Sequence, residues 1–191
     1  MLTRRICNGL IIFAISITMF YTTKPYATNI NINFSGFIKP GSCEVDLDRS
    51  FLQLDNVDYL TLKSGNALLS INKFIVNVHN CYLLANTILR PAIQIDGEGF
   101  YAGTKFFFQS SDSSARGIGA LLYQGDDAPQ YEAPSLKTGD YIDLGGSGSV
   151  PEDIKIPFYV GISCGSVSDC NSVNVTPGKM VARIIFNFRY Y

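Results

Sequence analysis

The chain has 191 residues, of which 47% are hydrophobic and only 16% are charged, and its formal net charge is −1. This composition supplies enough apolar side chains for a core and too few charges for a disordered chain. No basic run extends beyond the first few residues, which excludes nucleic-acid binding that depends on neutralising phosphates. At this length we expect one domain, or one domain with an extension.

The first 27 residues have the pattern of an export signal. Arg4 and Arg5 precede an apolar run from Leu10 to Phe20, and Ala27 follows a polar stretch after that run. The run is too short to span a bilayer, so a cleaved signal is favoured over a permanent membrane anchor. We therefore expect cleavage after Ala27, with a mature chain that begins at Thr28.

The cysteines indicate disulfides in an oxidising compartment. Cleavage of the signal removes Cys7 and leaves an even set, Cys43, Cys81, Cys164 and Cys170. Three pairings are possible, and the short separation of the last two favours Cys164–Cys170, which leaves Cys43–Cys81. A metal site is the competing interpretation, but the chain has no CxxC pair and His79 is its only histidine.

From Thr28 onward most segments alternate between apolar and polar residues, as half-buried strands do. The longest runs are Ile30 with Ile32, Phe34, Gly36 and Ile38; Phe74 with Val76 and Val78; and Ile154 with Ile156, Phe158, Val160, Ile162 and Cys164. Shorter candidates cover residues 51–57, 88–95, 105–109 and 118–123. Turn-forming clusters separate these runs, and no helical period extends past two turns. The pattern predicts an antiparallel β-sandwich without an internal repeat.

Residues 178–191 form the most regular of these segments. One face carries Met180, Ala182, Ile184, Phe186, Phe188 and Tyr190, and the opposite face is mostly polar. A strand that reaches the last residue of the chain must be held by neighbours, because free termini normally fray. The simplest interpretation is that this segment is the last strand of an ordinary β domain.

Three motifs in the same order along the chain resemble pilus subunits assembled by the chaperone–usher pathway. The first is the stretch from Thr28 to Cys43, which is similar to the mature N-terminus of the minor tip adaptors of type 1 pili. The second is the alternating run that ends in Asn80-Cys81, and the third is Gly178 with the near-terminal Tyr190. Asp55 stands where many such subunits carry glycine, and the Cys164/Cys170 pair is outside their common pattern.

This resemblance implies an incomplete immunoglobulin-like sandwich that lacks its final strand. Residues 39–191 would form the pilin domain, and residues 178–191, beginning at Gly178, would form one wall of an acceptor groove. Residues 28–38 would form a donor strand that offers Ile30, Ile32, Phe34, Gly36 and Ile38 to a neighbouring subunit. The alternative for this segment is that it is the domain's own first strand.

The resemblance also implies partners and a location. The expected partners are a periplasmic chaperone, an outer-membrane usher and neighbouring pilus subunits, with no cofactor. The expected location is the cell-surface pilus, where the subunit would support cell adhesion. A tip subunit that itself binds a host glycan is the alternative, with exposed tyrosines such as Tyr123, Tyr131 or Tyr141 as candidates.

An enzyme is not expected from this sequence. A single histidine and oxidised cysteines remove the common nucleophile–base arrangements. The acidic pairs Asp126-Asp127 and Asp96/Glu98 lie in glycine-rich turns, where solvated carboxylates are expected and not a glycosidase pair. Residues 145–148 lack the lysine and following helix of a phosphate-binding loop. His79 is expected to point outward from its strand, and the sequence offers no partner for it.

Overall fold

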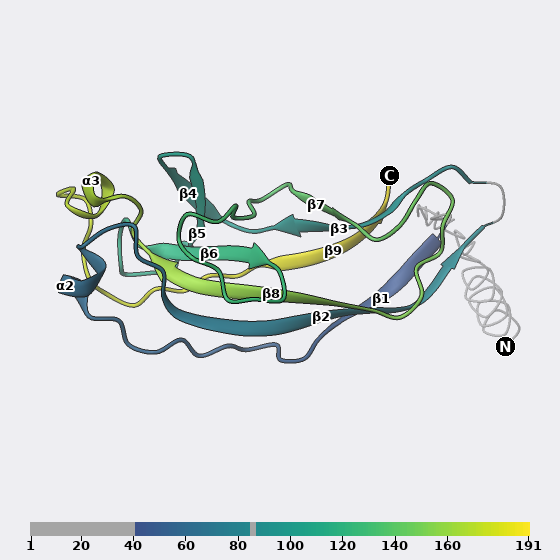
Figure 1. Cartoon of the computed structure of the whole chain (residues 1–191), viewed down its shortest axis with the longest axis horizontal. Coiled ribbons are helices and arrows are strands. Elements are labelled where there is room, and N and C mark those ends of the chain that lie inside the picture. The colour runs from purple at the N-terminus through teal and green to yellow at the C-terminus, as the bar shows by residue number, and fades with distance from the viewer. Residues whose placement is uncertain (1–40, 85–86) are drawn as a thin grey trace, which may run out of the picture. The chain divides into compact units, whose positions relative to one another are not determined.

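The computed structural model describes residues 41–84 and 87–191 (Figure 1). The predicted export signal and the predicted donor strand, residues 1–27 and 28–38, lie outside the described residues. Within the described residues, no helix is long and apolar enough to cross a membrane. The elements are β1 (Gly41–Leu47), α2 (Tyr59–Leu62), β2 (Leu69–Leu83), β3 (Pro91–Asp96), β4 (Gly99–Ala102), β5 (Lys105–Phe108), β6 (Gly119–Gln124), β7 (Tyr141–Asp143), β8 (Ile154–Ser163), α3 (Val167–Cys170) and β9 (Ile185–Tyr190).

The strands form two antiparallel sheets that pack as a sandwich. One sheet has the order β1-β2-β8-β6-β5-β4, and the other has the order β7-β3-β9. The predicted all-β antiparallel fold is therefore confirmed. The orders β1-β2-β8-β6 and β7-β3-β9 follow those of strands A-B-E-D and C′-C-F in an immunoglobulin-like domain. In such a domain a further strand pairs with the outer edge of F, and among the described residues nothing pairs with that edge of β9.

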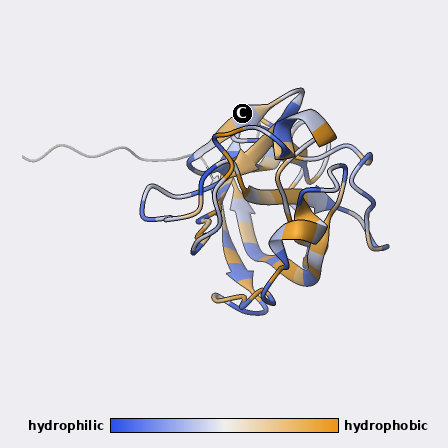
Figure 2. Ribbon diagram, turned by 90° about the vertical axis from the view of Figure 1, so that its left-hand side faces the viewer, coloured by the Kyte–Doolittle hydropathy of each residue, from blue (hydrophilic) through white to orange (hydrophobic). Residues whose placement is uncertain are grey.

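The inward faces of both sheets supply the core, as their alternation predicts. Val76 and Val78 on β2, and Ile93 and Ile95 on β3, are fully buried. Phe158 on β8 belongs to the same cluster, which extends over both sheets. Apolar and polar residues alternate in colour along the strands in Figure 2. The sequence period of two thus places one row of side chains in the core and the next in solvent.

Two of the predicted strands differ from the structure. Residues 51–57 were expected to form a strand, but they form none, because they have no neighbouring strand to pair with. The predicted C-terminal strand, residues 178–191, is assigned as β9 only over Ile185–Tyr190. Residues 178–184 continue in the same direction, but their neighbour is the loop of residues 110–115 and not a strand.

Both pairs of cysteines favoured by the sequence are disulfides in the structure. Cys43 on β1 joins Cys81 on β2. This bond links two strands that already pair with each other, near a β-bulge between Ser42 and Glu44. Cys164 follows β8 and joins Cys170 at the end of α3, which closes a short loop.

Candidate functional site

A groove of about 1070 Å³ lies between two extended segments of the chain. Residues 47–57, except Asp48, form one wall, and residues 177–186, except Ile185, form the other. We call these the 47–57 wall and the 177–186 wall. The floor is apolar and consists of inward-facing core residues, Phe74, Ile118, Ala120, Val160 and Ile162. Each floor residue is no more than 9% exposed, so the groove opens directly onto the core.

The 177–186 wall is held along one edge by the loop of residues 110–115. The carbonyl of Lys179 accepts from the backbone N–H groups of Ser114 and Ala115, at 2.9 and 3.0 Å. The carbonyl of Val181 accepts from Ser110 N at 2.7 Å. The Ser113 hydroxyl accepts from Val181 N and donates to Val181 O, both at 3.0 Å. The odd-numbered residues of this wall therefore direct their backbone groups away from the groove.

The even-numbered residues of the same wall direct their backbone groups to the opposite edge, because these groups alternate along an extended chain. Within the described residues, the N–H and C=O groups of Met180, Ala182 and Ile184 have no hydrogen-bond partner. Their side chains pack against the core. This wall thus offers a row of free main-chain donors and acceptors beside an apolar floor.

The 47–57 wall has fewer attachments. Asp48 N donates to Ile75 O at 3.0 Å, and Ile75 N donates to the Asp48 carboxylate at the same distance. The bond from Ile75 N lowers the pKa of Asp48. Further along, Asp55 N donates to the Ser70 hydroxyl at 2.7 Å. Between these two points, residues 49–54 make no hydrogen bond to another strand in the described part of the chain, while Leu52 and Leu54 pack against the core.

Two extended segments therefore face each other across an apolar floor, and both have backbone groups without a strand partner on the groove side. Unpaired edges of this kind are templates for an added strand, and alternating side chains of that strand would enter the floor. The charged groups that line the groove lie on its walls and on the 110–115 loop, where Asp112 forms a bidentate pair with Arg183 of the 177–186 wall at 2.8 Å. Hydrogen bonds from Arg183 lower the pKa of Asp112.

No group of three or more His, Cys, Asp or Glu residues in the described ranges could hold a metal ion.

Of the C-terminal residues singled out from the sequence, Gly178, Met180, Ala182, Ile184 and Phe186 line the groove. Gly178 lies against the 110–115 loop, where a Cβ atom would meet Ala115 N at 2.7 Å. This close approach requires the absence of a side chain.

Phe188 and Tyr190 do not line the groove. Phe188 packs against the core cluster. The Tyr190 ring lies at the start of β1, so close that a Cβ atom on Gly41 would be 2.7 Å from it. Burial raises the pKa of Tyr190. At this end β9 lies beside β1, whereas the groove extends toward α2, which lines its other end.

Sequence reasoning missed the other parts of the groove. The apolar alternation of Leu52 and Leu54 was visible, but it predicted a strand and not a wall. Tyr59 and Leu62 of α2 also line the groove, and a helix of one turn leaves no periodic signal. The serines of residues 110–115 look like an ordinary turn in the sequence, yet they hold the 177–186 wall.

The other candidate sites have structural explanations. His79 has the partner that the sequence did not suggest, since its Nε2 lies 2.7 Å from the Asp46 carboxylate, which raises the pKa of His79. Asp96 accepts from Gly97 N, and Glu98 accepts from Ser111 N. These carboxylates stabilise turns.

The tyrosines proposed for glycan binding do not form a common exposed surface. Tyr123 is 2% exposed, and its hydroxyl donates to the carbonyl of Tyr131. Burial raises the pKa of both tyrosines. Tyr141 is 46% exposed and lies on β7, next to Tyr191. The burial of Tyr123 removes it from any sugar-binding role.

No protein-family model and no curated protein matches the chain in sequence. Among solved structures, the P pilus rod subunit PapA is 13% identical with a TM-score of 0.49, over 80% of this chain and all of that chain (100%). A chaperone–usher pilus, solved to reveal the molecular basis of rod uncoiling, is 13% identical with a TM-score of 0.46 over 88% of this chain and 99% of that chain. The resemblance to tip adaptors stays a prediction.

Proposed function

We propose that this chain is a structural subunit of a bacterial surface pilus, completed by a strand from another protein and supporting cell adhesion through the assembled pilus. The observation that carries this proposal is the groove, in which free backbone groups of the 177–186 wall lie beside an apolar floor. Addition of a strand to an exposed sheet edge would satisfy both features at once. No reaction chemistry is needed for this role.

The burial of apolar side chains gives such a strand a strong driving force. Four large apolar side chains, each contributing roughly 1.5–3 kcal/mol, give an upper estimate of roughly 6–12 kcal/mol before the cost of ordering the strand. Main-chain hydrogen bonds to Met180, Ala182 and Ile184 would add to this. Without an occupant, the unpaired edge beside the apolar floor should make the subunit prone to aggregation.

The expected order of partners follows from the route to the cell surface. A periplasmic chaperone would fill the groove first, and a neighbouring subunit delivered through an outer-membrane usher would then replace it. Residues 28–38 are the strand that this subunit would offer, with Ile30, Ile32, Phe34 and Ile38 entering the next groove and Gly36 fitting where a side chain would clash.

Co-purification from the periplasm tests the groove. The natural chain should emerge with a chaperone, and a chain without residues 178–191 should not. A sharper test compares two substitutions at neighbouring residues. Ile184→Asp places a carboxylate against the core, and the control Ile185→Asp changes a side chain that is already 53% exposed. Ile184→Asp should lose the partner and Ile185→Asp should keep it. A stable, partner-free monomer of the natural chain would contradict the proposal.

Deletion of residues 28–36 tests the donor role separately. The truncated subunit should still bind the chaperone, because its groove is intact, but it should fail to complete the next subunit. Polymerisation assays and electron microscopy of assembled pili would measure this. Normal polymerisation of the truncated chain would assign the segment to the domain's own fold.

A further inference from the structure

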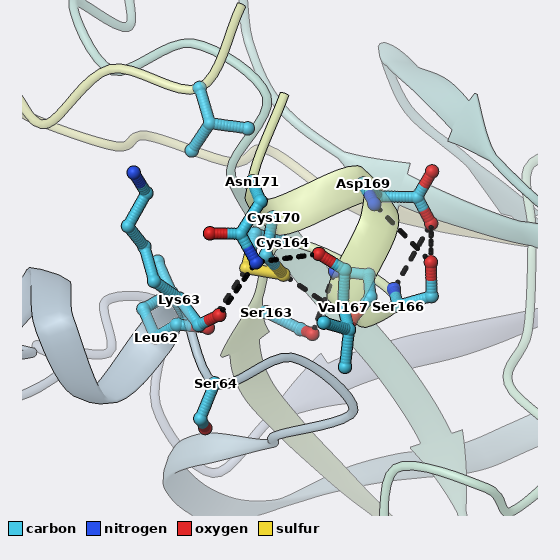
Figure 3. Close-up of a disulfide and its surroundings, with 12 residues drawn as sticks. Leu62, Lys63, Ser64, Ser163, Cys164, Ser166, Val167, Asp169, Cys170 and Asn171 are labelled. Atoms are coloured by element: carbon cyan, nitrogen blue, oxygen red, sulfur yellow. Dashed lines mark hydrogen bonds between the residues drawn. A yellow bond between two sulfur atoms is a disulfide. The ribbon is translucent and has the colours of Figure 1, made fainter. Parts of the chain in front are cut away.

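The second disulfide lies beside Leu62, the last residue of α2 (Figure 3), and α2 lines one end of the groove. Cys164 and Cys170 are 2% and 0% exposed. The Cys164 sulfur lies 3.1 Å from the carbonyl oxygen of Leu62, the last residue of α2. Both cysteines belong to a buried cluster with Leu62, against which Met180 of the 177–186 wall also packs. The disulfide is therefore continuous with the packing at this end of the groove.

The loop closed by this disulfide also contacts the chain that follows α2. Asn66 N donates to Gly165 O at 2.8 Å, and the Asn171 side chain donates to Lys63 O at 3.3 Å. Gly65 approaches so closely that a Cβ atom would lie 2.4 Å from the backbone of Val167. Gly65 also has φ +71°, a conformation that favours glycine. These contacts seat the end of α2 directly on the disulfide loop.

α2 cannot hold its own position. It has four residues, and a single helical turn is not stable without tertiary contacts. Its groove-lining side chains are Tyr59 and Leu62. The Tyr59 hydroxyl donates to Val175 O at 3.0 Å, in the segment that follows the disulfide loop. The position of this end of the groove therefore depends on the loop that Cys164 and Cys170 close.

We infer that the Cys164–Cys170 disulfide is a positioning element that preorganises the α2 end of the groove for an apolar side chain of the inserted strand. The inference rests on the proposed function, because it concerns the same groove. Neither cysteine lines the groove, so the effect acts through Tyr59 and Leu62. Without the disulfide these residues would have to be ordered on binding, and a rigid site binds more tightly because that cost is already met.

Peptide binding tests the inference. The probe is a labelled synthetic peptide with the sequence of residues 28–38 of this chain, and the receptor is the chain purified together with its periplasmic chaperone, which the peptide displaces. The double variant Cys164→Ser/Cys170→Ser should bind about tenfold more weakly, the loss expected when one apolar contact is poorly formed. Hydrogen exchange over residues 59–65 should become faster in the same variant. The control is Val173→Ser, at a side chain 93% exposed in the segment after α3, which should bind as the natural chain does.

A second variant keeps both cysteines. Gly65→Ala should push α2 away from Val167 and weaken peptide binding while the disulfide remains, as mass spectrometry can verify. The Gly65→Ala variant decides the question if the double variant does not fold. Binding within twofold of the natural chain by every variant that folds would overturn the inference. Failure of the natural chain to bind any added strand, whether from the chaperone or from the peptide, would instead contradict the proposed function, so the two outcomes are distinguishable.

Discussion

The two walls of the groove are both extended and both turn apolar side chains inward, yet they are held differently. The 177–186 wall is bound at successive odd-numbered residues by the loop of residues 110–115. The 47–57 wall is attached near its two ends, through Asp48 and Asp55. We expect the first wall to be a fixed edge that sets the register of an inserted strand. We expect the second wall to adjust to it, because few backbone bonds restrain it.

The largest effect is expected at the disulfide of β1, the strand that precedes the 47–57 wall. The Cys43–Cys81 disulfide spans a separation of 38 residues and anchors β1, which leads into this wall. Replacing both cysteines by alanine should lower the free energy of unfolding by about 4 kcal/mol in the chain-entropy treatment. The Cys164–Cys170 pair spans a separation of 6, and its removal should cost about 2 kcal/mol.

Urea denaturation of the two double variants would measure this difference. Equal losses for both pairs would show that strain or residual structure, and not loop length, decides the effect. A larger loss at Cys164–Cys170 would indicate that the packing around α2 contributes more to the fold than the β1–β2 staple does.

The next effect concerns the side chains of the 177–186 wall. The Phe186 ring lies 5.8 Å from that of Phe74 and 5.0 Å from that of Phe158. Phe186→Ala should lower the free energy of unfolding by about 2–3 kcal/mol, because it opens a cavity at a partly exposed position of the core. Its neighbour Ile185 is 53% exposed, so Ile185→Ala should change stability by less than about 0.5 kcal/mol. Similar losses in both variants would mean that the inward alternation of this segment is wrong.

A smaller effect should come from the hydrogen bonds that hold the 177–186 wall to the loop of residues 110–115. The Ser113 hydroxyl satisfies both the N–H and the C=O group of Val181. Ser113→Ala should cost about 1–2 kcal/mol, because the Val181 N–H group loses its partner, while the Val181 carbonyl keeps the bond from Ser110 N. The backbone N–H of Ser111 donates to Glu98, and this bond does not involve the Ser111 side chain. Ser111→Ala is therefore the matched control and should leave the free energy of unfolding nearly unchanged.

Hydrogen exchange of Val181 would report directly on this bond. Faster exchange at Val181 in Ser113→Ala, with none in Ser111→Ala, is the expected result. If Val181 stays protected, the backbone bond from Ser110 to its carbonyl is sufficient to hold the wall, and the serine is dispensable.

The sequence predicted the sandwich because its core strands carry local information. The runs around Phe74, Phe107 and Phe158 alternate or stay apolar over the length of a strand, and each became one. The 177–186 wall was also visible, since Met180, Ala182 and Ile184 share a period of two. For these elements the side-chain pattern alone separates the buried face from the exposed face.

The rest of the groove depends on contacts between distant residues, which no local pattern records. Residues 51–57 alternate like a strand but have no strand to pair with, so the prediction of a strand there was wrong. Ser113 and Val181 are far apart in the sequence, and their bonds follow from the fold. α2 has a single turn, which is too short to leave a periodic signal in the sequence, and its position depends on contacts with the distant disulfide loop.

The smallest predicted effect lies on β1, the strand that leads into the 47–57 wall. His79 Nε2 is 2.7 Å from the Asp46 carboxylate, and Nδ1 is 3.5 Å from that of Glu44. The hydrogen bond to Asp46 is the main cause of the raised pKa of His79, with smaller contributions from the charges of Glu44 and Asp153. A raised pKa in the folded state stabilises the fold below the unfolded value of about 6.5. That contribution is lost as the pH rises through the folded pKa.

The chain has a single histidine, so one imidazole signal followed by NMR gives this pKa without assignment. Asp46→Asn should return the pKa of His79 toward its ordinary value, and Glu44→Gln should lower it by less. Equal shifts would mean that general charge, and not the bond to Asp46, is responsible. Because the imidazole is partly exposed, the stability of the β1–β2 pairing should change only slightly with pH, and added salt should reduce that change further. A steep dependence of stability on pH would instead show that the 47–57 wall is held mainly through this ion pair.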